Sequence, residues 1–202
     1  MKGLLIVAVT LVMMPARASA QVSASDLAGA LADLTSSVNA LPMSLRSTRL
    51  LTAVEWLNSR SVKADLAVMS RDYVASLSRA AGLLRKQPGA EVVEDVTSEL
   101  EAKVEHCRKL GVGMGGSVLV KVNTRRGSGT VSGLEVLYLL KFDDWLRTPA
   151  RNFARMSSPA EMTIDPGRYW VWARDPANGT TSDRVLVQVA GQKEDTIDLA
   201  VR

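Results

Sequence analysis

The most reactive side chains in this sequence are a single histidine, His106, and a single cysteine, Cys107, which stand next to each other. Both fall in a stretch with helical spacing, and neighbouring residues of a helix point to different faces. We therefore expect no thiolate–imidazole pair, and a zinc site with one histidine and one cysteine would need several carboxylates as well. The spacing of Cys107 matches the apolar positions around it, which favours a buried helix position over a disulfide to another molecule.

Two groups of acidic and amide side chains could supply oxygen ligands or acid–base chemistry. They are the pair Asp143-Asp144 and the group Asp175, Asn178 and Asp183. Neither group has the spacing of a calcium loop, and an ordinary role in turns accounts for both. Two acids that are neighbours in a loop also give no sign of the paired carboxylates of a hydrolase, which face each other across a cleft. The sequence thus predicts no catalytic residue, no metal site, no cofactor and no enzyme.

Residues 1–20 have the three parts of a secretory signal. Lys2 precedes an apolar run from Gly3 to Met14, and the small residues Ala18-Ser19-Ala20 follow. The run is shorter than the ~20 apolar residues that cross a bilayer, and no later segment is apolar enough to do so. We expect cleavage after Ala20 and a secreted or periplasmic protein without a membrane span.

The charge of the mature chain argues against nucleic acid as a partner. The formal net charge is +4, and removal of Lys2 and Arg17 with the signal leaves 4 − 2 = +2. No run of Lys and Arg is dense enough to follow a phosphate backbone.

The first half of the mature chain, residues 21–111, has the spacing of helices. Apolar residues recur three or four positions apart over 25–41, 44–87 and 90–110. The stripe of the first segment is Leu27, Leu31, Leu34, Val38 and Leu41, with the spacing of a coiled-coil seam.

The helical phase slips at residues 58–61, so two arrangements of 44–87 are open. One long helix would make antiparallel hairpins with its neighbours, whereas two helices would make a four-helix bundle. In both cases the apolar stripes are first of all packing surfaces, and self-association through them is the second interpretation.

From residue 112 to 202 the pattern changes to the two-residue alternation of strands. Turn signals such as Asp165-Pro166-Gly167 and Asn178-Gly179 separate the short segments, and a longer Arg-rich loop interrupts them at 142–159. These features predict an antiparallel β-sandwich. The predicted fold class is therefore α+β, with a helical hairpin or bundle followed by a β-sandwich.

Several strand segments in this second half resemble a known class of domain. They are Val118–Val122, Gly133–Val136, Pro166-Gly167-Arg168-Tyr169 and Ile197-Asp198-Leu199, together with Ser157-Ser158-Pro159 leading into a strand. These segments look like prealbumin-like domains, closest to the carboxypeptidase regulatory-like and PEGA-type modules of surface proteins. The resemblance covers about residues 116–202 and implies an accessory module that rigidifies, spaces or binds.

Aromatic and aliphatic residues gather on one face of the predicted sandwich. The resemblance implies that Tyr169, Val171 and Ala173 point inward, so alternation turns Trp170 and Trp172 to the opposite face. By the same argument Leu137 and Leu139 point outward beside them. Such a face rarely stays exposed to water. Either the helical half covers it, or it binds a partner protein or a glycan.

We expect a non-enzymatic exported protein that acts in binding or assembly at the cell envelope, with the β-sandwich as an accessory interaction module. The alternative is a small-molecule or carbohydrate-binding protein in which Trp170, Trp172 and Trp145, with Leu137 and Leu139, form the binding surface. The expected partners are an envelope protein or a glycan.

Overall fold

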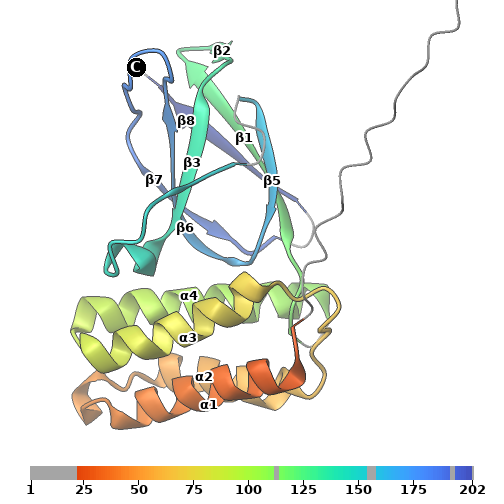
Figure 1. Ribbon diagram of the computed structural model, residues 1–202, viewed down its shortest axis with the longest axis vertical. Coiled ribbons are helices and arrows are strands. Elements are labelled where there is room, and N and C mark those ends of the chain that lie inside the picture. Colours follow the sequence, from red (N-terminus) through yellow and green to blue (C-terminus); the bar gives the residue numbers. More distant parts are fainter. Residues whose placement is uncertain (1–21, 112–113, 154–157, 192–193, 202) are drawn as a thin grey trace, which may run out of the picture.

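The computed structural model describes residues 22–111, 114–153, 158–191 and 194–201. The predicted export signal and its cleavage after Ala20 lie outside these residues. The described chain forms a two-layered group of helices on which a β-sandwich stands by one of its ends (Figure 1). This arrangement confirms the predicted α+β class, with the helices in the first half and the sheets in the second.

Four α-helices form the first half: α1 (Ala24–Ala40), α2 (Thr48–Ser61), α3 (Arg71–Lys86) and α4 (Ala90–Leu110). A short 3-10 helix, η1 (Met43–Leu45), joins the first two. Serine side chains cap α1, α2 and α3 by accepting a backbone N–H of the first turn. Gly111 ends α4 in the left-handed conformation (φ 67°), as expected for a glycine after a helix.

Of the two arrangements that the sequence left open for residues 44–87, the structure has two helices, so this segment is not one continuous helix. Residues 62–70 separate them, directly after the slip in apolar phase. Ser70 then starts α3, because its hydroxyl accepts the N–H of Tyr73 at 2.9 Å. The linker is also tied to the segment that connects α4 with β1, since the Asp65 N–H donates to the Met114 carbonyl at 3.0 Å.

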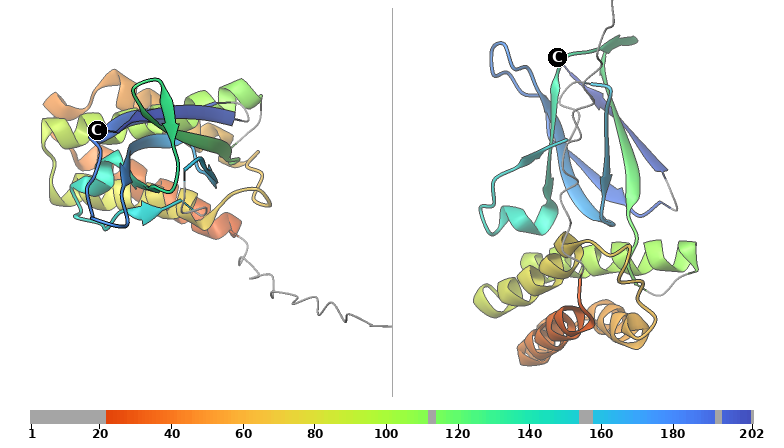
Figure 2. Two further views of the ribbon diagram at one scale, coloured as in Figure 1. Left: turned by 90° about the horizontal axis from the view of Figure 1, so that it is seen from above. Right: turned by 45° about the vertical axis from the view of Figure 1, so that its right-hand side comes forward.

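The four helices make a bundle of two layers. α1 packs on α3 and α2 packs on α4, so that α3 and α4 lie between the outer helices and the sandwich (Figure 2). Leu34, Leu57, Leu77 and Leu100 are fully buried between the layers. The predicted stripe of α1 is therefore used in packing within the chain. None of the described helices is long and apolar enough to cross a membrane.

The β-sandwich has two sheets. In the first, β1 (Val118–Arg126) is central: β5 (Ala160–Ile164) and the short β2 (Gly129–Val131) pair with one edge, and β8 (Glu194–Ala200) pairs with the other. The second has the order β4 (Arg151–Asn152), β3 (Glu135–Leu140), β6 (Gly167–Arg174) and β7 (Val185–Val189). A 3-10 helix, η2 (Lys141–Asp144), follows β3. Among the described strand pairs β1–β8 alone is parallel.

The sandwich core follows from the alternation in the sequence. Val118, Val120 and Val122 of β1 are fully buried, and they face Tyr169 and Val171 of β6 in the same apolar cluster. Tyr169, Val171 and Ala173 point inward as predicted. The alternation of β6 therefore places Trp170 and Trp172 on the outer face of the second sheet.

Candidate functional site

The residues predicted to form a binding face do lie together on the outer side of the second sheet. Leu137 is opposite Trp172, and Leu139 is opposite Trp170, in the β3–β6 register. Leu137, Leu139 and Trp172 form a small apolar cluster, with Ala150 and Trp170 packed against it. Alternation in two neighbouring strands was sufficient to predict this grouping.

This face is largely covered by other parts of the chain. Leu137, Leu139 and Trp172 have exposed fractions of 7%, 5% and 7%. The Arg184 guanidinium lies 4.6 Å from the centre of the Trp172 ring, and the Lys141 ammonium lies 5.4 Å from the Trp170 ring. A ligand stacking on these rings would have to displace both cations, and a binding role for this face stays a prediction.

Trp145, the fifth predicted site residue, connects the sandwich with helix α4. Its ring N–H donates to the Asp95 carboxylate at 2.8 Å, and the Lys141 ammonium bonds the same carboxylate oxygen at 2.9 Å. Lys141 also lies near the rings of both Trp145 and Trp170. We use the term aromatic latch for the group of Asp95, Lys141, Trp145 and Trp170. This group holds η2 against the bundle.

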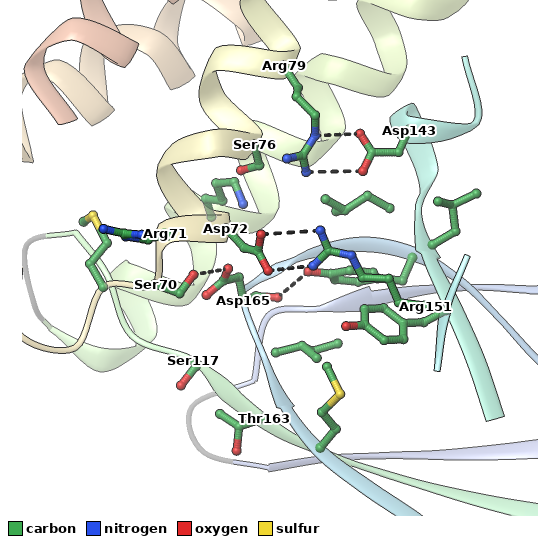
Figure 3. Close-up of a pocket in the computed structure, with 18 of the residues that line it drawn as sticks. Ser70, Arg71, Asp72, Ser76, Arg79, Ser117, Asp143, Arg151, Thr163 and Asp165 are labelled. Atoms are coloured by element: carbon green, nitrogen blue, oxygen red, sulfur yellow. Dashed lines mark hydrogen bonds and ion pairs between the residues drawn. The ribbon is translucent and has the colours of Figure 1, made fainter. Parts of the chain in front are cut away.

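A cavity of about 580 Å³ lies between α3 and the end of the sandwich, and we term it the interlayer cavity (Figure 3). This volume lies in the range of small-molecule sites, roughly 300–1,000 Å³. The bundle supplies Leu66, Met69, Ser70, Asp72, Ser76, Arg79 and Lys103, and the sandwich supplies Tyr138, Leu139, Leu140, Asp143, Arg151, Met162, Thr163, Ile164, Asp165 and Tyr169.

The turn between β5 and β6 lies beside this cavity and is bound to the helical half. Residues at the start of α3 and within α4 make hydrogen bonds to polar groups of the turn. The Ser70 hydroxyl donates to the Asp165 carboxylate at 2.5 Å, and the Lys103 ammonium donates to the Pro166 carbonyl at 2.9 Å. The Arg168 N–H donates to the Glu99 carboxylate at 2.7 Å. We refer to residues 165–168 as the anchor turn.

Glu99 and Lys103 form a buried ion pair beneath the anchor turn. Their charged atoms are 2.9 Å apart and both side chains are only 1% exposed. The Lys103 ammonium also lies 4.6 Å from the centre of the Tyr73 ring. A buried pair needs further polar contacts to both partners. The anchor turn provides them to Lys103 and to Oε2 of Glu99, whereas Oε1 faces the Lys103 ammonium without a hydrogen bond from any described residue.

Two further ion pairs line the interlayer cavity. Arg79 binds both oxygens of Asp143, at 2.9 and 3.2 Å, and Asp143 is buried. Arg151 binds Asp72 at 2.6 Å nearer the solvent, where the side chains are 52% and 58% exposed. The inner pair is therefore held firmly, whereas the outer pair can exchange its partners at little cost.

Burial raises the pKa of two carboxyl groups in the cavity. For Asp143 the loss of hydration is the largest cause, and Arg79 acts in the opposite direction. For Asp165 burial again dominates, Lys103 and the Ser70 hydroxyl oppose it, and the negative charge of Asp72 adds to it. Both carboxylates thus lie in surroundings that disfavour negative charge.

The histidine and the cysteine belong to the packing of α4. Cys107 is fully buried, as the helix-face interpretation predicts, and burial raises the pKa of its thiol. The His106 ring is also fully buried, and its Nδ1 lies 2.7 Å from the Gly191 carbonyl. Neither side chain lines the interlayer cavity.

The acidic residues considered as metal ligands are bound by other groups. Asp143 binds Arg79, and Asp144 lies 3.3 Å from Arg184. The Asp175 carboxylate accepts the Ala177 N–H and an amide N–H of Asn178 within its turn.

Sequence reasoning did not find the interlayer cavity. Its walls come from three regions that are far apart in the chain: α3, β3, and β5 with the anchor turn that follows it. The sequence did show Asp165-Pro166-Gly167 as a turn, and Ser70 could have been identified as a helix cap. Nothing in the sequence pairs these two segments.

Comparison of the chain with protein-family models, with curated protein sequences and with solved structures finds no match. The likeness to carboxypeptidase regulatory-like domains therefore stays a prediction from the strand segments.

Proposed function

We propose that this chain is an exported, non-enzymatic binding protein of the cell envelope, and that it holds a small molecule in the interlayer cavity. The observation that carries this proposal is the cavity itself, which opens where the bundle and the sandwich meet and has both apolar and charged walls. Ligand sites commonly lie at such junctions. The proposal that the chain is exported rests on the sequence pattern of residues 1–20.

The arrangement of charges favours binding over catalysis. Asp143 is held by both of its oxygens, and Asp72 is paired with Arg151. A general base needs a carboxylate or imidazole directed at the substrate. His106 lies outside the cavity lining, and of the lining carboxylates only Asp165 has no ion pair among the described residues, while its Oδ2 accepts the Ser70 hydroxyl. Paired carboxylates and guanidinium groups are well suited to hold polar groups of a ligand in fixed positions.

The direct test blocks the cavity from its rim. Thr163 is exposed on β5 and lines the cavity (Figure 3), so Thr163→Trp fills the opening without crowding the core. Glu161 is exposed on the same strand, two residues away and on the same side, but is not part of the lining. Glu161→Trp is therefore the matched control.

The measurement is equilibrium dialysis of the mature protein against a metabolite extract of its native host, followed by mass spectrometry. We expect compounds that the wild type and Glu161→Trp retain and that Thr163→Trp releases. Equal retention by all three proteins, or no retained compound, would contradict the proposal.

A second candidate function, assembly with an envelope protein, is favoured by the edge strand β7. Val185 and Leu186 are 40% and 37% exposed, and β7 carries no charged residue or proline. By contrast β8, an edge of the other sheet, carries Glu194, Asp195 and Asp198. Unprotected apolar edges pair readily with a strand of another chain.

A photo-crosslinking residue at Leu186 in the native host tests this second candidate. A single crosslinked envelope protein that is lost from a Val185→Lys variant would support assembly through β7. Absence of any intermolecular product would leave the cavity as the site of function.

A further inference from the structure

One carboxylate at the interlayer cavity has no ion-pair partner within the described chain. Three carboxylates have a cation at ion-pair distance: Glu99 with Lys103, Asp143 with Arg79, and Asp72 with Arg151. Asp165 has none within 4 Å among the residues that the structure describes. Asp165 is therefore the carboxylate of this cavity that a cationic ligand group could pair with.

The other cations near the cavity do not form an ion pair with Asp165. Lys103 already contacts Glu99, the Pro166 carbonyl and the face of the Tyr73 ring. Arg71 stands on the rim, but in Figure 3 its guanidinium extends away from the Asp72–Arg151 pair. Its charge acts on Asp26 of helix α1.

The structural role of Asp165 occupies only part of its carboxylate. Oδ2 accepts the hydroxyl of Ser70, which supports the start of α3. Among the described residues no donor reaches Oδ1. A half-buried carboxylate oxygen without a donor is costly unless a ligand or water supplies one.

The surroundings of Asp165 favour a positive group on the ligand. Burial and the charge of Asp72 raise the pKa of Asp165, and a cation next to its carboxylate would offset both effects. A negative ligand group would have to displace Asp72 from Arg151 and would then lie near Asp165 and Asp143. The apolar part of the cavity lining includes Met69, Met162 and Ile164.

We propose that Asp165 binds the ammonium group of an organic amine whose apolar body lies against Met69, Met162 and Ile164. This inference rests on the proposed function of the interlayer cavity and names the chemical class of its ligand. Tyr138, which also lines the cavity, adds an aromatic ring of the kind that attracts organic cations.

The test uses three probes that share one body and differ in the head group: 4-phenylbutylamine, 4-phenylbutanol and 4-phenylbutyrate. Binding to the mature protein is measured by isothermal titration calorimetry near neutral pH. We expect the amine to bind about tenfold or more tightly than the alcohol, as expected for one ion pair in a partly buried site. The carboxylate probe should bind most weakly.

Asp165→Asn removes the charge but keeps an oxygen that accepts the Ser70 hydroxyl, so the start of α3 is preserved. It should lower the affinity for the amine about tenfold or more and leave the weak affinity for the alcohol unchanged. Asp198→Asn makes the same charge change on β8, where the carboxylate bonds Asn123 and Arg125, and should not affect binding.

The outcomes separate this inference from the proposed function. Binding of all three probes with similar affinity, blocked by Thr163→Trp, would overturn the role of Asp165 and keep the cavity as a site. Preference for 4-phenylbutyrate would assign recognition to Arg151 instead. If none of the probes binds, the amine inference is wrong, and the dialysis experiment still decides whether the cavity holds another ligand.

Discussion

Gly167 lies where the sandwich comes closest to helix α4. A side chain at this position would place its Cβ 2.6 Å from one oxygen of Glu99. That carboxylate has little freedom to move away, because Lys103 and the Arg168 N–H both hold it. The missing side chain thus allows the buried ion pair and the anchor turn to meet.

Gly167→Ala is therefore expected to lower the free energy of unfolding by about 1–3 kcal/mol, the usual effect of overpacking. The measurement is chemical denaturation of the mature protein. Gly29→Ala is the control: this glycine lies in α1 with no atom within 4 Å of its missing Cβ. It should raise stability by up to about 1 kcal/mol, because alanine favours a helix.

His106 makes the stability depend on pH. Burial lowers its pKa below the ordinary value of about 6.5, and the nearby charges of Lys103 and Lys109 act in the same direction, while Asp195 opposes them. Nδ1 bonds the Gly191 carbonyl, whereas Nε2 is buried without a partner among the described residues. A second proton on the ring would thus have no acceptor.

Because the folded pKa is lowered, the unfolded chain binds more protons than the folded chain near pH 6.5 and below. The contribution of His106 to the free energy of unfolding is therefore fully present above about pH 6.5, and it is lost as the pH falls below this value. We expect the free energy of unfolding to fall between pH 7 and pH 5, and His106→Asn, which keeps a donor for Gly191, to reduce this slope. An identical slope in both proteins would assign the effect to other groups.

At the scale of single elements, the aromatic latch holds η2 to the bundle. The ring N–H of Trp145 donates to Asp95, and Asp95 also binds Lys141. η2 lies at the start of the loop at 142–159, which the sequence showed only as an interruption between strands.

Trp145→Phe keeps an aromatic ring near Lys141 but removes the donor to Asp95. We expect a loss of about 1 kcal/mol in the free energy of unfolding, typical of one partly exposed hydrogen bond. Trp56→Phe is the control, since the indole N–H of Trp56 donates to no described residue. Equal effects of the two substitutions would mean that ring size matters here and the hydrogen bond does not.

The elements that the sequence predicted well are those whose contacts are encoded by periodicity. The apolar stripe of α1 and the alternation of Val118, Val120 and Val122 both became core. The break between α2 and α3 left a phase slip that could be interpreted in two ways. The parallel pairing of β1 with β8 left no trace in either strand, because parallel and antiparallel neighbours bury the same alternating side chains.

The candidate site residues were also predictable only in part, because only contacts that follow a regular spacing can be seen in the sequence. Trp170 and Trp172 share a face with Leu137 and Leu139, and two-residue alternation shows this directly. The side chains that cover this face were not predictable, since Arg184 and Lys141 come from segments without regular spacing. The interlayer cavity depends on how one half of the chain docks on the other, and no local pattern records that docking.

At the scale of the whole molecule, the bundle and the sandwich are coupled through the anchor turn, the buried Glu99–Lys103 pair and the aromatic latch. Apolar packing adds to these polar contacts, because Phe142 of η2 is fully buried in the apolar cluster of the bundle. The Arg79–Asp143 pair also joins the two halves. The two halves are therefore held together by both polar and apolar contacts.

Calorimetry of the mature protein should show one cooperative unfolding transition. Lys103→Met leaves the Glu99 carboxylate buried without its cation, at a cost of about 3–5 kcal/mol, and should move the transition to a lower temperature. Lys121→Met removes an exposed pair with Glu194 on the sandwich and should change stability by no more than about 1 kcal/mol. A single unshifted transition in the Lys103→Met protein would show that the pair does not couple the halves.

The parallel pairing of β1 with β8 also sets an order in time. β1 follows directly on the bundle in the chain, yet its partner β8 is the last of the described strands to leave the ribosome. Until β8 arrives, one long edge of β1 stays unpaired and open to other chains. The bundle, whose contacts are closer together in sequence, can form first, and the newly made sandwich is then exposed to aggregation until its closing strand is in place.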